Sequence, residues 1–215
     1  MDWLTANWRT VIDLAGSHLY LAGLPLLIGL VLSVPLGWAA KRWRGAYPAV
    51  VTSTGLLYTI PSLALFVIMP LILGTKILDP ANVVVAMTIY TVALLARTVA
   101  DGLISVPDHV EQAATAMGYR GLRRLFGVEL PLAVPVIAAG LRVAAVSNVS
   151  IVSIASVVGV SQLGNLLVDG YRRIIWGELL TGIVATMVLA LLLDLVIQLV
   201  ARGLTPWRRA TGARA

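Results

Sequence analysis

The sequence predicts an all-α membrane protein with about five transmembrane helices. Of its 215 residues, 59% are hydrophobic and only 12% are charged, about half the charged share of an average soluble domain. Three long runs, 19–40, 45–75 and 143–168, contain no Asp, Glu, Lys or Arg. A helix needs about 20 apolar residues to cross roughly 30 Å of hydrocarbon, so each run is long enough to span a membrane. We expect one domain, 1–215, with its core at about 17–201.

The residue inventory argues against an enzyme, a metal protein or a nucleic-acid-binding protein. Cysteine is absent, which removes thiolate ligands and thiol nucleophiles. The sequence has no phosphate-binding Gly-Lys-Ser/Thr loop, no His-Glu-x-x-His and no Gly-x-Ser-x-Gly. His18 and His109 are isolated at span edges, and neither is given a metal role. The net charge of +6 lies in residues that flank apolar runs rather than on a basic face interleaved with aromatic residues. We therefore expect no catalytic residue, no cofactor, no metal and no nucleic acid.

The apolar runs divide into five predicted spans, at about 19–40, 49–74, 82–105, 131–160 and 177–201. The second span is long and contains Pro61 and Pro70. Proline lacks a backbone N–H and clashes with the preceding turn, so we expect a break or kink near Pro61. If the two halves were separate spans, the chain would have six.

The positions of the basic residues predict the orientation. With five spans, one side of the membrane receives most of the 16 basic residues, namely Lys41, Arg42, Arg44, Arg120, Arg123, Arg124, Arg202, Arg208, Arg209 and Arg214. The opposite side receives Arg9, Lys76, Arg172 and Arg173. Because basic residues concentrate on the cytoplasmic side, we expect the 106–130 loop and the C-terminus in the cytoplasm and the N-terminus outside. Six spans would break this pattern, so five are favoured.

The 106–130 loop has the pattern of a short helical hairpin. Pro107 and Asp108 are typical of a helix start. Apolar residues then recur at helical spacing, at Val110, Ala113, Ala114 and Met117. Gly118 suits a C-terminal cap, and a second short amphipathic piece follows it. Because small residues on one face allow close approach, the pattern predicts a docking surface.

This loop resembles the EAA loop of binding-protein-dependent ABC importer permeases. The match consists of Gln112-Ala113-Ala114, Gly118 and Leu130-Pro131 at fixed spacing. It implies the type I ABC importer permease fold, with a cytoplasmic coupling helix in this loop that docks on a separate ATPase subunit. The family has Glu at the position of Gln112; here Glu111 lies one residue earlier, about 100° around a helix. The implied ATPase-coupling residues are Glu111, Gln112, Ala113, Ala114, Gly118, Leu130 and Pro131.

Two further stretches narrow the resemblance to one subfamily. Residues 58–65 (Tyr-Thr-Ile-Pro-Ser-Leu-Ala-Leu) and 129–142 are similar to the glycine betaine, carnitine and choline permeases. Ser161-Gln162-Leu163-Gly164 departs from that group's Gly-Gly-Leu-Gly. The resemblance implies import of glycine betaine, choline, carnitine or proline across the cytoplasmic membrane by alternating access.

The same resemblance implies the partners. They are a cytoplasmic ABC ATPase, a second permease subunit (a copy or a close relative), an extracytoplasmic solute-binding protein and membrane lipid. The alternative is a secondary transporter for a small solute. Such proteins usually show internal repeats and midplane ionisable residues for coupling ions, and this sequence shows neither an internal repeat nor a midplane carboxylate cluster.

The break expected at Pro61 suggests where a translocation path lies. A broken helix exposes backbone carbonyls, which a membrane protein tolerates only where a cavity or other protein groups receive them. Tyr58, Pro61, Ser62 and Tyr90 are the candidate path residues. The two tyrosine rings could hold a quaternary ammonium by cation–π attraction, although tyrosines in spans are more often anchors or core residues.

Each charged residue within a span could have either a structural or a functional role. Arg97 and Asp101 are four residues apart, and a self-satisfied i,i+4 pair is favoured over a functional site. Asp194 could face the path or a partner subunit. It could equally pair with Arg142 near the inner interface, and the sequence leaves these alternatives open.

Overall fold

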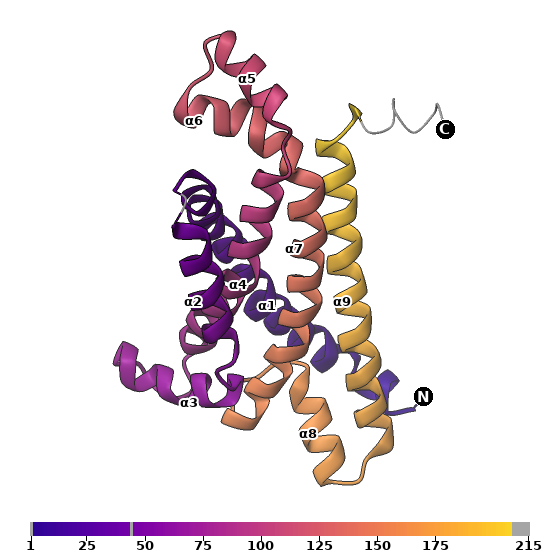
Figure 1. Ribbon diagram of the computed structural model, residues 1–215. Helices are drawn as coiled ribbons and strands as arrows, with labels where there is room; N and C mark the ends of the chain where they lie inside the picture. The colour runs from indigo at the N-terminus through magenta and orange to yellow at the C-terminus, as the bar shows by residue number, and fades with distance from the viewer. Residues whose placement is uncertain (1, 44, 208–215) are drawn as a thin grey trace.

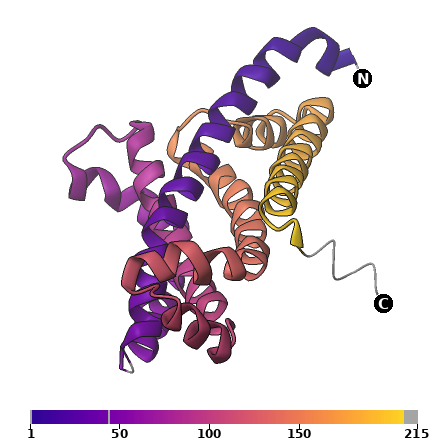
Figure 2. The ribbon, with the colours of Figure 1, turned by 90° about the horizontal axis from the view of Figure 1, so that it is seen from above.

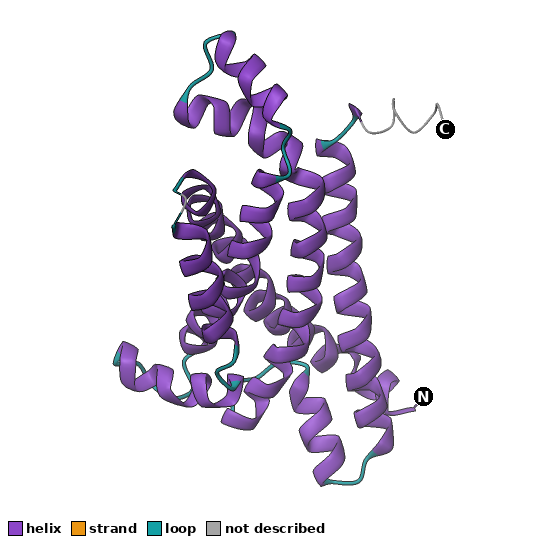
Figure 3. Ribbon diagram, in the orientation of Figure 1, coloured by secondary structure: helices purple, strands orange, loops and turns teal. Residues whose placement is uncertain are grey.

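The computed structural model describes residues 2–43 and 45–207, which form helices joined by short turns (Figure 3). Four described stretches are long and apolar enough to cross a membrane: Trp3–Arg42, Pro80–Ile104, Gly121–Val158 and Trp176–Leu204. The elements in chain order are α1 (Asp2–Arg42), α2 (Ala46–Tyr58), α3 (Ser62–Leu73), α4 (Pro80–Ile104), α5 (Asp108–Ala116), α6 (Gly121–Arg124), the π-helix η1 (Leu125–Glu129), α7 (Leu130–Val152), the 3₁₀-helix η2 (Ser153–Val158), α8 (Gly164–Arg172) and α9 (Trp176–Leu204). The predicted all-α membrane fold is confirmed.

The break predicted near Pro61 is present and sharp. Helices α2 and α3 are bent by 96° at this point. Pro61 is the N-cap of α3 and has extended backbone angles, φ −60° and ψ 129°. Figure 1 shows α2 running from one end of the bundle to the other, with α3 lying across the far end. The bent pair therefore makes one crossing between α1 and α4, which brings the number of crossings in the described chain to five.

Helix α1 extends far beyond the predicted span 19–40. It has 41 residues, which correspond to roughly 60 Å at 1.5 Å per residue, twice the thickness of the hydrocarbon. The helix lies obliquely across the bundle, as Figure 2 shows from above. The charged residues Arg9 and Asp13 lie within this helix, because charge by itself does not end a helix, and Asn7 interrupts it with non-helical angles.

Helix α4 is the central helix of the bundle, and glycines allow its neighbours to approach closely. A Cβ placed on Gly29 of α1 would lie 2.4 Å from Thr91 Cγ2, and one on Gly140 of α7 would lie 2.3 Å from Thr98 Cγ2. Asn148 of α7 donates to Thr91 Oγ1 at 2.9 Å and to the Ala22 carbonyl at 3.3 Å. Close backbones and an interhelical hydrogen bond are the usual means of packing helices in lipid.

Helix α9 packs against α7 and α8 and leaves most of its surface uncovered. Only 6% of its most apolar window is buried within the chain. Asp194 accepts from Arg142 of α7 at 2.5 Å and 3.0 Å, so the pairing that the sequence left open is the one observed. Helix α8, which links η2 to α9, was not predicted, because its nine residues are too few for a span and show no strong start signal.

Basic residues that the charge argument used lie at both ends of the bundle. Helices α5 and α6 project from one end, and α3 and α8 lie at the opposite end (Figure 1). Lys41 ends α1 at the same end as α5, and Arg172 ends α8 at the other. Four residues of the charge argument, Arg44, Arg208, Arg209 and Arg214, lie outside the described residues.

Candidate functional site

Helices α5 and α6 form the predicted hairpin at the end of the bundle. Gly118 has φ +88° and Gly121 has φ +51°, a left-handed region that favours glycine. The positive φ lets the chain reverse directly after α5, because the Gly118 and Tyr119 N–H groups then bond back to the carbonyls of Thr115 and Ala114. The cap role predicted for Gly118 is confirmed by this geometry.

The hairpin runs into α7 through a π-helical turn. The Leu130 N–H donates to the Leu125 carbonyl, five residues back. Pro131 follows, and in an α-helix its ring would clash with the carbonyl four residues earlier. The wider π-turn accommodates the proline while keeping the helix continuous. Leu130 and Pro131 thus shape the joint between the hairpin and the span.

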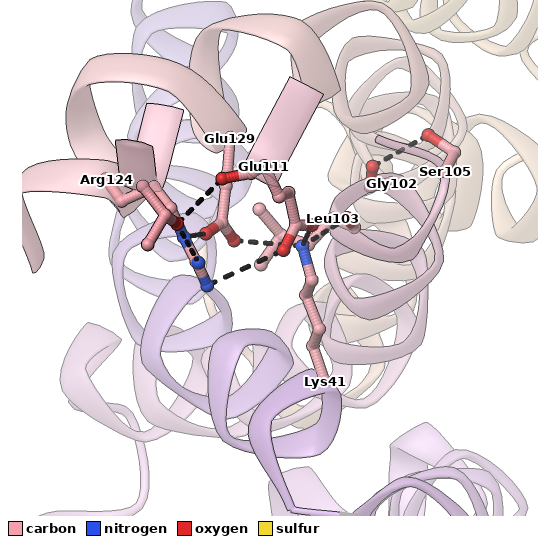
Figure 4. Close-up of polar contacts among 8 residues, drawn as sticks. Lys41, Gly102, Leu103, Ser105, Glu111, Arg124 and Glu129 are labelled. Carbon is pink, nitrogen blue, oxygen red and sulfur yellow. Dashed lines mark hydrogen bonds and ion pairs between the residues drawn. The ribbon is translucent and has the colours of Figure 1, made fainter. Parts of the chain in front are cut away.

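An ionic network holds the hairpin against the bundle (Figure 4). Lys41 Nζ at the end of α1 donates to Glu129 Oε2 at 2.9 Å and also to Glu111 Oε1. Its third hydrogen bond, of 2.9 Å, goes to the Leu103 carbonyl at the end of α4. Arg124 Nε donates to Glu129 Oε1 at 2.6 Å, and its NH2 lies 3.5 Å from Glu111 Oε2. Two cations and two carboxylates therefore join α1, α4, α5, α6 and η1.

Burial makes the loss of one charge from this network more costly than the loss of one charge from a surface ion pair. The Glu129 side chain is only 1% exposed, and those of Lys41 and Glu111 are each 17% exposed. A buried carboxylate that loses a partner leaves an uncompensated charge, which costs about 3–5 kcal/mol. The four charges neutralise one another, and Arg124 also donates to Thr115 Oγ1 at 3.1 Å. The arrangement ties α5 to the ends of α1 and α4 and to the start of α7.

The residues of the predicted apolar stripe lie on two different faces of α5. Ala114 is only 1% exposed and faces into the chain. Gln112 and Ala113 are exposed, as is Met117, which is 71% exposed. The predicted stripe treated Ala113 and Ala114 as one surface, but successive residues lie about 100° apart on a helix. The prediction that both alanines present a docking surface is therefore wrong for Ala114.

The candidate path residues meet at the break between α2 and α3. The rings of Tyr58 and Tyr90 contact edge to face, with centroids 5.8 Å apart and planes at 87°. The Tyr90 hydroxyl donates to the Ile60 carbonyl, which the break at Pro61 frees from the helix ladder. Tyr90 is 3% exposed, whereas Tyr58 is 41% exposed. Ser62, half-buried, begins α3 beside them.

A buried cluster explains the sequence departure at Gln162. His18 of α1 and Gln162 are both 0% exposed, and His18 Nδ1 lies 2.8 Å from Gln162 Oε1. His18 Nε2 contacts the Val149 carbonyl at 3.0 Å. The Gln162 amide also donates to the Val152 carbonyl at 3.1 Å. A glycine would leave these groups without partners, so Gln162 ties the end of α7 to α1.

The comparison with protein families identifies the chain. Residues 23–209 match the family described as binding-protein-dependent transport system inner membrane component. The chain belongs to this family. The permease is a transport component whose energy comes from a separate ATPase subunit, and the alternative of a secondary transporter falls away.

Curated relatives are similar over nearly the whole permease. The osmoprotectant import permease protein OsmW of Salmonella typhimurium is 34% identical, with 96% of this chain and 97% of that protein covered. The choline transport system permease protein OpuBD of Bacillus subtilis is 31% identical, with 100% and 94% covered. In fold, the permease resembles a chain of the inward-facing MetNI methionine ABC transporter, with a TM-score of 0.81, 21% identity and coverage of 93% and 98%. The type I ABC importer permease fold is confirmed.

The charged pair Arg97–Asp101 has the structural role favoured from the sequence. Arg97 Nε lies 3.6 Å from Asp101 Oδ2, and the two side chains are 63% and 43% exposed. Asp101 also accepts from the Tyr47 hydroxyl at 2.7 Å, which ties α2 to α4. The pair therefore lies on the surface of the permease and links helices.

Sequence reasoning missed three residues of the ionic network. In the sequence analysis, Lys41 and Arg124 served only to predict the orientation of the spans. Glu129 appeared only as part of the 129–142 stretch. Glu129 did carry a signal, because it is an acidic residue directly before a span. Glu111, expected at a contact with the ATPase, instead bonds within the permease to Lys41 and Arg124.

Proposed function

We propose that the chain is the permease subunit of an ATP-driven importer for a small osmoprotectant, such as glycine betaine, choline, carnitine or proline. The relatives OsmW and OpuBD, named for osmoprotectant import and choline transport, support this chemical class. The observation that carries the proposal is the exposed face of α5, held at the end of the bundle on a rigid ionic mount.

The docking surface for the ATPase is the outward face of α5. His109, Gln112, Ala113 and Ala116 lie on one side of the helix and are exposed, and Met117 follows them. Glu111 and Ala114 lie on the opposite, inward side. Because Ala113 is small, an ATPase groove can approach the helix backbone closely. Gly118 reverses the chain so that α6 does not cover this face.

The substitution Ala113→Glu tests the docking surface. A charged side chain in a packed interface combines overpacking, about 1–3 kcal/mol, with an unpaired charge, so we expect at least about tenfold weaker ATPase binding. Ala81→Glu is the matched control, because Ala81 is an exposed alanine at the opposite end of the bundle. Normal copurification of the ATPase with an inserted Ala113→Glu protein contradicts the proposed surface. Ala114→Glu instead probes packing inside the hairpin.

The hairpin faces the cytoplasm and the N-terminus faces outside, in our proposal. The basic residues Lys41, Arg120 and Arg123 at the hairpin end support this orientation. The chain contains no cysteine, so labelling of a single cysteine introduced at Ala6 or at His109 shows on which side of the membrane that position lies. We expect an impermeant thiol reagent added to intact cells to label Ala6→Cys and to spare His109→Cys. The reverse pattern contradicts the orientation.

The solute path passes the α2–α3 break and is completed by a second permease subunit, a copy or close relative. Tyr58 supports this placement, because its ring is partly exposed. Its neighbour Tyr90 is buried, and the Tyr90 hydroxyl already donates to the Ile60 carbonyl. An aromatic face attracts a quaternary ammonium group. We expect Tyr58→Phe to retain uptake of labelled glycine betaine and choline, and Tyr58→Ala to reduce it severalfold. Equal uptake by both variants contradicts a role for the ring.

Transport follows from movement of the mounted hairpin. A solute-binding protein delivers the solute outside, and ATP-driven closure of two ATPase subunits brings two α5 helices together. Since Lys41 and Glu129 connect α5 to α1 and α7, this movement rocks the spans between outward-open and inward-open states. Uptake assays in cells with and without the gene test the proposal: loss of osmoprotectant uptake supports it, and unchanged uptake of every such solute contradicts the substrate class.

A further inference from the structure

A basic pocket lies between the last turns of α1 and the hairpin, on the side of α5 away from the proposed docking face. Its volume is about 200 Å³. The lining residues are Trp38, Arg42, Thr115, Tyr119, Arg120, Gly121 and Arg124. Thr115 lies one turn after Glu111 on the inward side of α5. The pocket therefore does not belong to the surface assigned to the ATPase.

The charges around the pocket favour the binding of an anion. Arg124 is neutralised by Glu129 and Glu111 in the ionic network. Arg42 and Arg120 are exposed and have no side-chain hydrogen bond or ion pair among the residues that the structure describes. Two uncompensated guanidinium groups thus share one small pocket. The planar fork of arginine matches the oxygens of a phosphate group, which it can bind in bidentate fashion.

The surroundings of the pocket place it at the level of the lipid headgroups. Trp38 is half-buried one turn before Arg42, at the end of a long apolar helix, and Trp43 is 61% exposed. Tryptophan concentrates at membrane–water interfaces. On the hairpin side, Leu122 and Phe126 are each 59% exposed and lie one turn apart. Exposed apolar side chains beside arginines are typical of a helix that lies in the interface.

We propose that this pocket binds the phosphate headgroup of an anionic membrane phospholipid. The phosphate lies between Arg42 and Arg120, and the Trp38 and Tyr119 rings contact the glycerol region. Aromatic walls and the adjacent Leu122 and Phe126 favour a lipid over a free phosphate ion, because they cover acyl chains as well as the headgroup. The bound lipid joins the end of α1 to the hairpin and adds to the ionic mount.

The test uses the purified permease–ATPase complex in nanodiscs of phosphatidylcholine with increasing phosphatidylglycerol, with bound phosphatidylglycerol counted by native mass spectrometry. Each basic residue near an anionic surface contributes enough for about a fivefold change in binding. We expect Arg42→Gln and Arg120→Gln each to weaken phosphatidylglycerol binding about fivefold, and the double variant to weaken it more. The control is Arg172→Gln/Arg173→Gln, which removes two exposed arginines at the opposite end of the bundle.

Three results overturn the proposal. The first is equal loss of phosphatidylglycerol binding in the Arg42→Gln/Arg120→Gln variant and in the control. The second is binding of soluble glycerol phosphate as tight as that of phosphatidylglycerol, which makes the pocket a site for free anions. The third is the absence of phosphatidylglycerol from the permease–ATPase complex when the permease without the ATPase binds it, which assigns the arginines to a protein contact. Retention of lipid in the complex, with selective loss in the Arg42 and Arg120 variants, supports the proposal.

Discussion

The hairpin end of the bundle and the α2–α3 break are held together in very different ways. At the hairpin end, Lys41, Glu111, Arg124 and Glu129 join five elements through a largely buried ionic network. At the break, Tyr90 contributes a hydrogen bond to the Ile60 carbonyl and an edge-to-face contact with Tyr58. From this difference we infer that the hairpin moves together with the ends of the spans, whereas the α2–α3 break deforms at a lower cost in free energy.

The largest effect is expected from Lys41→Met, which removes the centre of the ionic network. Glu129 keeps Arg124, but Glu111 and Glu129 lose the cation that they share. Breaking a buried ionic group in this way costs about 3–5 kcal/mol, so we expect a clearly lower unfolding temperature and ATP hydrolysis uncoupled from transport. Lys76→Met, in an exposed loop at the other end, is the control. Coupled transport at the normal rate in Lys41→Met would mean that the hairpin needs no ionic mount.

A smaller effect is expected from Tyr90→Phe at the break. The change removes one hydroxyl and leaves the Ile60 carbonyl without its partner, at a cost of about 0.5–1.5 kcal/mol for an ordinary hydrogen bond, because Ile60 is 38% exposed. The ring contact with Tyr58 remains. Thermal unfolding in detergent, with Tyr58→Phe as the matched control, measures the difference. If both variants unfold at the same temperature as the parent protein, the hydroxyl does not hold the break.

The Arg142–Asp194 pair is an ionic contact outside both regions, and it joins two long spans, α7 and α9. The Arg142 guanidinium donates to both carboxylate oxygens of Asp194, at 2.5 Å and 3.0 Å. We expect Asp194→Asn to lower stability by leaving Arg142 unpaired, and Arg142→Gln/Asp194→Asn to recover part of the loss. Unfolding temperatures of the parent protein, Arg142→Gln, Asp194→Asn and the double variant measure this coupling. Strict additivity of the two single changes would show that the pair is not a unit.

The smallest effect is expected from Arg97→Gln. Arg97 is 63% exposed and lies 3.6 Å from Asp101, and such i,i+4 pairs contribute about 0.2–0.5 kcal/mol. Asp101 keeps its hydrogen bond from Tyr47. We expect unchanged transport and an unfolding temperature close to that of the parent protein. A loss comparable to that of Lys41→Met would place Arg97 in the functional machinery after all.

Local features of the molecule were predictable from the sequence. The break at Pro61 follows from the chemistry of proline, and the turn at Gly118 from the spacing of the loop motif. Both depend on a few neighbouring residues. The charge pattern likewise indicated which end of each span lies beside the hairpin, since it depends only on the order of apolar runs and basic residues.

Features that depend on tertiary packing were not predictable. His18 and Gln162 are 144 residues apart, and nothing local to either indicates the other. Ala114 lies on the inward side of α5 with Glu111, and the helical pattern alone could not separate it from Ala113. Lys41 had the same appearance in sequence as the other basic residues at the end of a span.

The most direct test of the rigid mount is a pair of distance measurements in the assembled transporter. The absence of cysteine allows spin labels at chosen exposed sites: His109 on α5, Trp43 after α1 and Leu71 on α3. We expect the distance from His109 to Trp43 to stay within about 2 Å between the nucleotide-free and ATP-bound states, the scale of small helix shifts, while the distance from His109 to Leu71 changes more. A change from His109 to Trp43 as large as that from His109 to Leu71 would contradict the account.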